Sequence, residues 1–441
     1  MTNGRPNWFL VLAATAVVPL LGLVVSEAGL GRRDLSDILG PLSIVTLVLG
    51  LVLGVGYSCL AGWAGANRDR NAAVFPVTVP VALVAVGLLT SGQVGIVLVT
   101  FFSVGTGVRL SGFIAIAGLV AAFAVLRSTR ELLRTPTHYE TAIRVRPDQA
   151  PALWALVDDV ATTVATPVPR NLIVGLRPGF YATAARVALE QNGRTMSGET
   201  LYLSVTLLRL LTRPQVAAVV GHELGHLKGA DVAYTRRFAP AFAGLDAAVR
   251  TTQDLDDDVI QRLARWPALT FSRFLLAVFA TNESRIRRDR EFEADRVGAA
   301  AASPPTLAAA LLKISAYADL WPRLQRLAVA EVQAGLASPD LATSFEALAR
   351  RDAHGLARST VTSLLRVRTT RPFDTHPPTS ERLAALGVDP TDLDLSLADG
   401  WARESDVNDE LTRLGEELTA LEMEMIVAYA EVRSSRTLRA A

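Results

Sequence analysis

The sequence predicts a membrane region of several α-helical spans, followed by a mainly helical α+β domain with a small sheet. Half of the 441 residues are hydrophobic and only 20% are charged, which is apolar for a soluble protein of this size. The apolar excess lies in residues 1–126, whereas the rest has the composition of an ordinary charged globular protein. We therefore expect a membrane domain over residues 1–134, a second domain over 135–390 and a helical tail over 391–441.

The N-terminal third contains uncharged runs that are long enough to cross a bilayer. No charged residue occurs over 7–26, 38–67 or 71–108, and roughly 20 helical residues cross a hydrocarbon core about 30 Å thick. The last of these runs is too long for one span and short for two. We expect four spans, with the third near Phe75–Phe101 and the fourth near Leu110–Leu126, and five spans are the alternative.

Positive charge places the following domain in the cytoplasm, because arginine and lysine gather at the cytoplasmic ends of spans. Arg68 and Arg70 agree with this orientation under a four-span count, whereas Arg32 and Arg33 oppose it. The arginines that closely follow the last expected span also favour a cytoplasmic domain; they are Arg127, Arg130, Arg134, Arg144 and Arg146. The net charge of +1 gives no reason to expect a nucleic-acid partner.

The residues after Pro136 read as α+β. Pro151–Thr163 has helical spacing. Three short runs rich in β-branched or aromatic residues, bounded by Gly, Pro or Asn, predict a small sheet over Asn171–Val174, Phe180–Ala185 and Thr200–Val205. Beyond residue 206 the patterns are almost wholly helical.

The stretch from Leu211 to Asp231 carries the clearest chemistry and reads LTRPQVAAVVGHELGHLKGAD. A capping pair, Thr212 with Gln215, begins a predicted helix. Residues four apart share one helix face, so His222 and His226 can converge on one metal ion with Glu223 beside it.

Zinc suits such a pair, because it accepts imidazole and carboxylate ligands and leaves a position open for water. A bound zinc lowers the pKa of its water towards about 7, and Glu223 can then act as general base. The H-E-x-x-H pattern is typical of a metalloprotease helix. The competing interpretation is a helix with two half-buried histidines. The chain has only five histidines, and the presence of two of them in this motif favours a metal site.

A third, acidic ligand is expected on a second helix. The segment from Arg287 to Ala300 reads RRDREFEADRVGAA, in which Glu291 and Asp295 lie four residues apart and share a face. In this pattern Glu291 binds the metal, and Asp295 accepts a hydrogen bond from the far nitrogen of a ligating histidine. Asp231 is a second candidate for that outer role. Alone, the segment would read as a solvated, salt-bridged helix face.

HELGH followed by EFEAD resembles the family of membrane zinc metallopeptidases that contains HtpX and the type 1 CAAX prenyl proteases. The segment 375–378, THPP, is similar to a C-terminal segment of that family. The resemblance covers roughly residues 145–386. It implies a zincin-like metallopeptidase domain with one Zn²⁺ per chain, bound by His222, His226 and Glu291, and with Glu223 as general base.

The resemblance also implies roles for two further segments. Phe180, Tyr181, Ala182 and Thr183 resemble an edge strand that binds the substrate backbone by strand addition. His376 lies near the active site in such a domain, where it donates a hydrogen bond to the reacting oxyanion. A histidine at a helix entry before a Pro-Pro turn is the alternative interpretation of His376.

The chain departs from that family in one region. HtpX-like proteins carry two spans between the HExxH helix and the glutamate, but here only Trp266–Ala280 is strongly apolar, and Arg273 interrupts it. We expect a core helix, or one that grazes the membrane interface.

The function expected from these residues is a membrane-bound zinc metalloendopeptidase, with protein or peptide substrates that include membrane proteins, and with the lipid bilayer as its surroundings. The alternative is a catalytically decayed, protease-like membrane scaffold or sensor. Decay usually removes a ligand or the base, whereas all four expected residues are present.

Overall fold

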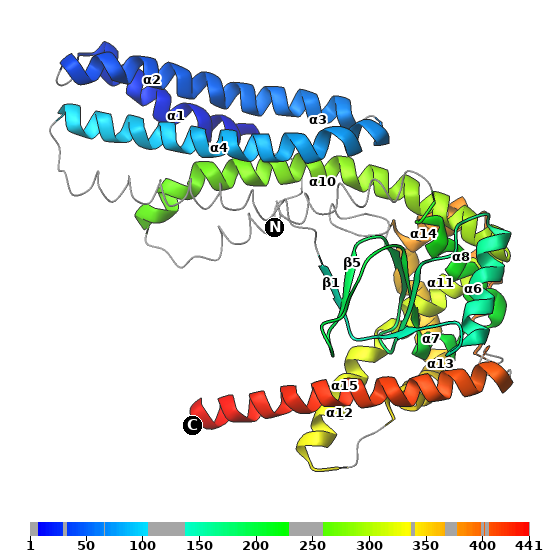
Figure 1. Cartoon of the computed structure of the whole chain (residues 1–441). Coiled ribbons are helices and arrows are strands. Elements are labelled where there is room, and N and C mark those ends of the chain that lie inside the picture. The colour runs from blue at the N-terminus through cyan, green and yellow to red at the C-terminus, as the bar shows by residue number, and fades with distance from the viewer. Residues whose placement is uncertain are drawn as a thin grey trace. The chain divides into compact units, whose positions relative to one another are not determined.

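A computed structural model describes residues 8–29, 33–65, 67–104, 137–228, 259–336, 340–366, 377–397, 401 and 405–440. These residues form two compact units (Figure 1). The first contains the described residues of 8–104 and 259–286, and the second contains those of 137–228 and 287–440. The predicted fold class, membrane helices followed by a mainly helical α+β domain, is confirmed.

The first unit is built from long apolar helices that run side by side (Figure 1). They are α1 (Trp8–Glu27), α2 (Arg33–Leu51), the π-helical turn η1 (Val52–Gly56), α3 (Tyr57–Gly65), α4 (Arg68–Val104) and the first part of α10 (Val259–Ala301). Among the described residues, three single helices are long and apolar enough to cross a membrane: Trp8–Glu27, Asp34–Ala64 and Ala73–Ser103. They coincide with the first three expected spans, and the expected fourth, Leu110–Leu126, lies outside the described residues.

Small residues let these helices approach closely. A Cβ atom added at Gly22 would lie 2.4 Å from Ser43 Oγ, and one at Gly92 would lie 2.6 Å from Thr46 Oγ1. Such contacts drive helix association in a bilayer, where burial of apolar side chains adds little. The apolar run of α10 belongs to the same packing, because Phe271 is fully buried in the cluster that α4 contributes to. The run is therefore a packed helix of the membrane unit.

The second unit contains two small sheets instead of one. The larger has the order β2-β3-β7-β4 and consists of β2 (Ile143–Val145), β3 (Asn171–Gly175), β7 (Thr200–Ser204) and β4 (Phe180–Thr183). The smaller has the order β1-β5-β6 and consists of β1 (Thr137–Glu140), β5 (Arg186–Leu189) and β6 (Thr195–Met196). The parallel pair β3 and β7 is buried along its whole length, and β4 pairs along one side with β7.

Helices surround the larger sheet and complete the core. They are α6 (Pro151–Thr163), α7 (Val205–Leu208), α8 (Arg213–Gly225), the end of α10, α11 (Pro304–Ala318), α12 (Leu320–Gln333), α13 (Leu341–Arg366), α14 (Thr379–Ala385), the short turn η2 (Pro390–Asp392) and α15 (Ser405–Ala440). One face of the sheet, with Leu172 and Leu201, joins a large cluster with α6 and α8. The opposite face, with Ile173 and Tyr202, packs against Val187 of the smaller sheet.

The C-terminal helix α15 is part of this core. Leu411 and Leu418 are fully buried in the large cluster. Glu410 also accepts hydrogen bonds from Ala152 N (2.7 Å) and Leu153 N (3.2 Å), at the start of α6. A carboxylate there satisfies N–H groups that the helix itself leaves unpaired, and Ala150, the residue at the N-cap of α6, has no side-chain oxygen to do so.

A buried carboxyl on α15 makes the unit sensitive to pH. Burial raises the pKa of Glu422 to about 7, and the neighbouring carboxylates of Glu140 and Glu190 add to the shift, against the opposing charge of Arg177. Because the folded state favours the protonated form, stability is lost as pH rises from the ordinary value near 4.5 through about 7. The loss is at most about 3 to 4 kcal/mol, because the pKa rises from 4.5 to about 7 and each pKa unit corresponds to about 1.4 kcal/mol.

We predict that Glu422→Gln raises the melting temperature relative to the wild type at pH 8 and changes it little at pH 4.5. The exposed Glu424 of the same helix provides the control, because the melting temperature of Glu424→Gln should equal that of the wild type at both pH values. Thermal unfolding followed by circular dichroism checks this. An equal difference between Glu422→Gln and wild type at the two pH values would contradict it.

Candidate metal centre

The HExxH helix is fixed at its start by the capping pair that the sequence predicts. Thr212 Oγ1 accepts a hydrogen bond from Gln215 N, and Gln215 Oε1 accepts one from Thr212 N. Lys313 of α11 donates from its buried Nζ to the same Gln215 Oε1 at 3.2 Å. At the other end, His226 keeps helical backbone angles just beyond the last residue of α8. His222 and His226 therefore stay on one face of one continuous turn.

Glycines bring α8 into backbone contact with the last turns of α10. A Cβ atom added at Gly298 would lie 2.6 Å from Ala218 O and 3.0 Å from His222 Cβ. One added at Gly221 would lie 2.7 Å from Ala301 Cβ. No ordinary side chain fits at such distances, so the missing Cβ atoms set the spacing of the two helices. That spacing lets a side chain from α10 reach the histidines of α8.

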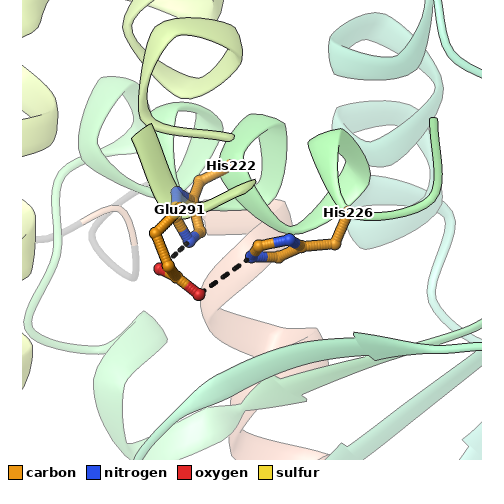
Figure 2. A group of neighbouring side chains, drawn as sticks. All are labelled: His222, His226 and Glu291. Carbon is orange, nitrogen blue, oxygen red and sulfur yellow. Dashed lines mark ion pairs between the residues drawn. The ribbon is translucent and has the colours of Figure 1, made fainter. Parts of the chain in front are cut away.

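His222, His226 and Glu291 meet at one point (Figure 2). His222 Nε2 lies 3.6 Å from Glu291 Oε2, and His226 Nε2 lies 3.6 Å from Glu291 Oε1. One ligand atom from each residue lies within 4.8 Å of the other two. The two imidazole rings are perpendicular, at 88°, with centroids 4.9 Å apart. Both rings thus direct their Nε2 atoms to the same carboxylate.

This donor set fits a zinc ion. Tetrahedral ligands at about 2.0–2.2 Å from zinc lie about 3.3–3.6 Å from one another, and both His–Glu separations, at 3.6 Å, agree with this spacing. Two imidazoles and one carboxylate also leave a fourth position for water or substrate, as catalytic zinc sites require.

Asp295 and Arg382 lie behind His222. His222 Nδ1 is 3.0 Å from Asp295 Oδ1, and Arg382 Nε donates to Asp295 Oδ2 at 2.9 Å. Burial pushes the pKa of Asp295 up, but hydrogen bonds from Arg382 and His222 outweigh it and hold that pKa below its usual range. Asp295 is therefore a carboxylate that accepts the Nδ1 proton of His222, which leaves the Nε2 lone pair directed at the metal position.

Arg382 was not among the residues singled out from the sequence. It lies in the short helix α14, and its partner Asp295 is 87 residues away. Its neighbours Glu381 and Leu383 give α14 the composition of an ordinary amphipathic helix. Only its place just after the 375–378 segment could have drawn notice.

The edge strand β4 lies beside Glu223. Ala182 N donates a hydrogen bond to Glu223 Oε2 at 3.0 Å, so this N–H points away from the partner strand β7. Because antiparallel residues alternate in the direction of their backbone groups, Phe180 and Ala182 both present backbone groups at the free side of β4. The side chains of all four strand residues, Phe180–Thr183, are half-buried.

A buried carboxylate holds β4 from the other face of the sheet. Glu140 Oε2 accepts hydrogen bonds from Tyr181 Oη (3.1 Å) and from Arg177 (2.5 Å), and lies 3.2 Å from His138 Nε2. Tyr181 also stacks on Tyr202 with ring centroids 4.9 Å apart. Burial and the charge of Glu140 raise the pKa of Tyr181 far above its ordinary value, so the hydroxyl stays a donor.

Two predicted site residues, His376 and Asp231, lie outside the described residues. Their roles stay predictions from the sequence.

Comparison with known proteins identifies the domain. Residues 187–388 match peptidase family M48, a segment that runs from β5 to just beyond α14 and contains all three clustered residues. The chain carries an M48 peptidase domain. The M48 match leaves out the membrane helices α1–α4, the segment from β1 to β4 and the C-terminal helix α15. The resemblance inferred from HELGH and EFEAD is thereby confirmed.

Relatives of the M48 domain include proteins described as "Protease HtpX homolog". The one from Thermococcus kodakarensis is 30% identical over 186 residues, which cover 38% of this chain and 57% of the relative. The one from Polynucleobacter necessarius is 27% identical over 241 residues, 54% of this chain and 73% of the relative. The one from Ralstonia pickettii is 25% identical over 318 residues, 69% and 90%. No solved structure is significantly similar to the chain.

We predict that Gly298→Ala weakens the metal site. The added Cβ would meet the Ala218 carbonyl, so α8 and α10 must move apart, at a cost of about 1–3 kcal/mol for overpacking. The melting temperature and the zinc affinity should both fall. Gly62→Ala is the control, because that helical glycine of α3 has open space around it. A Gly298→Ala protein with wild-type stability and zinc affinity would contradict the role of this helix contact.

Proposed function

We propose that this protein is a membrane-bound zinc metalloendopeptidase. The observation that supports it most is that ligand atoms of His222, His226 and Glu291 lie within 4.8 Å of one another, while Glu223 accepts a hydrogen bond from the edge strand β4. The M48 domain and the HtpX homologues support peptidase chemistry. The apolar helices of the first unit support attachment to a bilayer.

Each residue of the candidate site would have a separate role in peptide-bond hydrolysis. His222, His226 and Glu291 would hold one zinc ion, which when bound lowers the pKa of water and polarises the scissile carbonyl. Glu223 accepts a proton from the attacking water and delivers it to the departing amine. Asp295 keeps His222 in the tautomer with a free Nε2 atom. His376 is the further candidate from the sequence for the oxyanion, and Asp231 for an outer hydrogen bond to a histidine.

The substrate would add a strand to β4. Phe180 presents its backbone groups at the free edge, and the Ala182 N–H at the same edge donates to Glu223, which therefore lies at the Ala182 end. An extended backbone paired there would place one of its peptide bonds next to the base. Tyr181 and Thr183 would contribute indirectly, through their pairing with β7.

Substrates would be proteins or peptides, membrane proteins among them, because the domain is joined to spanning helices. The arginines after the last expected span favour a cytoplasmic catalytic domain. Protease treatment of sealed right-side-out vesicles should therefore leave the M48 domain intact, and its digestion there would reverse the orientation.

We predict that Glu223→Gln keeps about one zinc per chain and loses activity at least about 100-fold, the usual contribution of a general base. Zinc content by mass spectrometry and cleavage of a casein-like substrate check this. The exposed Glu293 of α10 provides the control, since Glu293→Gln should retain both. Equal cleavage by wild type and Glu223→Gln would favour the alternative, a non-catalytic membrane scaffold or sensor.

Strand addition predicts an alternating sensitivity along the substrate. A peptide N-methylated at a position whose N–H pairs with β4 should lose about 3- to 10-fold in kcat/KM, the effect of one hydrogen bond. Methylation one residue further along should have little effect, because that N–H points away from the strand. A scan without alternation would exclude this binding mode.

A further inference from the structure

We propose that Arg382 is a positioning residue for the metal centre, which locks Asp295 so that His222 presents its Nε2 atom to the metal. The inference rests on the proposed function, because it assumes that His222 binds zinc. It concerns a residue that the ligand set and the general base do not include.

The first support is the geometry of the Arg382–Asp295 pair. Arg382 Nε donates to Asp295 Oδ2 at 2.9 Å, and its terminal nitrogen donates to Oδ1 at 2.5 Å. Both oxygens are thus occupied by one planar guanidinium, the bidentate arrangement that gives the most directional pairing. Asp295 cannot turn its carboxylate without breaking both bonds. Since Oδ1 also lies 3.0 Å from His222 Nδ1, the guanidinium indirectly sets the orientation of the imidazole.

The second support concerns the position of the His222 proton. The terminal nitrogen of Arg382 lies 3.5 Å from His222 Nδ1, whereas Asp295 Oδ1 lies 3.0 Å from it. An arginine N–H can only donate, so a bond to Nδ1 would favour the tautomer with its proton on Nε2. That tautomer cannot bind a metal through Nε2. The closer partner of Nδ1 is Asp295 Oδ1, a carboxylate oxygen that can only accept, and this contact favours the tautomer with its proton on Nδ1.

The third support is charge and burial. Glu291 and Asp295 are both buried, and Arg382 is 7% exposed. Arg382 contacts both carboxylates, with its terminal nitrogen 3.8 Å from Glu291 Oε2. A buried carboxylate without a partner is strongly unfavourable, and the guanidinium offsets this for Asp295 in particular.

The fourth support is the packing of α14, the helix that carries Arg382. The next residue, Leu383, is buried in a cluster with Ala308 and Leu312 of α11. Helix α14 is therefore anchored on α11, in addition to the bonds that Arg382 makes with Asp295 of α10. Through Arg382, a third helix, α14, is bonded to the contact between α8 and α10. A residue fixed in this way can restrain the orientation of Asp295 from outside that contact.

The test is zinc affinity of the full-length, detergent-solubilised protein, measured by competition with a chelator. We expect Arg382→Met to bind zinc about 10- to 100-fold more weakly, the usual effect of losing an outer-shell partner. Arg382→Lys should be intermediate, because an ammonium cannot occupy both carboxylate oxygens as a guanidinium does. The visible absorption of the cobalt-substituted protein should change in both variants. Should Arg382→Met fail to fold, Arg382→Lys decides the outcome.

Arg209→Met provides the matched control. Arg209 is similarly buried, at 8% exposed, but bonds to Glu346 and the Leu411 carbonyl. Its loss should lower the melting temperature and leave zinc affinity unchanged. Zinc binding by Arg382→Met that equals or exceeds the wild type would overturn the inference, since Arg382 would then be a charge partner only. Absence of zinc binding in the wild type would instead refute the proposed function.

Discussion

The close contact between α8 and the last turns of α10 is the constraint on which the site depends. His222 and His226 are placed by one helix and Glu291 by another, so their convergence requires a fixed helix spacing. Gly221 and Gly298 provide it, because backbone and Cβ atoms of the opposite helix fill the space where their side chains would be. A metal centre assembled across two helices requires a helix spacing of this kind.

Other parts of the second unit support this crossing from its sides. Lys313 of α11 bonds to the capping residue Gln215, and Arg382 of α14 bonds to Asp295. At the edge strand β4, Tyr181 donates a hydrogen bond to Glu140 of the smaller sheet. The geometry of the candidate site therefore depends on buried polar groups from several segments. Each is satisfied by named partners, as burial in a low-dielectric interior requires.

The features that were predictable from the sequence are those set by local periodicity. The capping pair and the four-residue spacings of His222 with His226 and Glu291 with Asp295 follow from helix geometry alone. The strands β3, β4 and β7 were predictable because their β-branched and aromatic residues lie between turn formers. The first three membrane helices were predictable because uncharged apolar runs of this length are typical of membrane-spanning helices.

The features that were not predictable depend on contacts between distant segments. Arg382 meets a partner 87 residues away. Strand β1, which contains His138 and Glu140, is too short and polar to be recognised as a strand from its own sequence. It is formed by parallel pairing with β5, almost fifty residues away. The packing of Phe271 among the membrane helices depends on tertiary structure, although the apolar run around it was visible.

The zinc K-edge X-ray absorption spectrum of the zinc-loaded protein tests the central claim most directly. We expect nitrogen and oxygen ligands at about 2.0–2.2 Å, together with the outer-shell scattering of two imidazole rings. Loss of one ring from that scattering in His226→Ala would identify the histidine. A spectrum with sulfur at about 2.3 Å, or with oxygen ligands and no imidazole, would contradict a site formed by His222, His226 and Glu291.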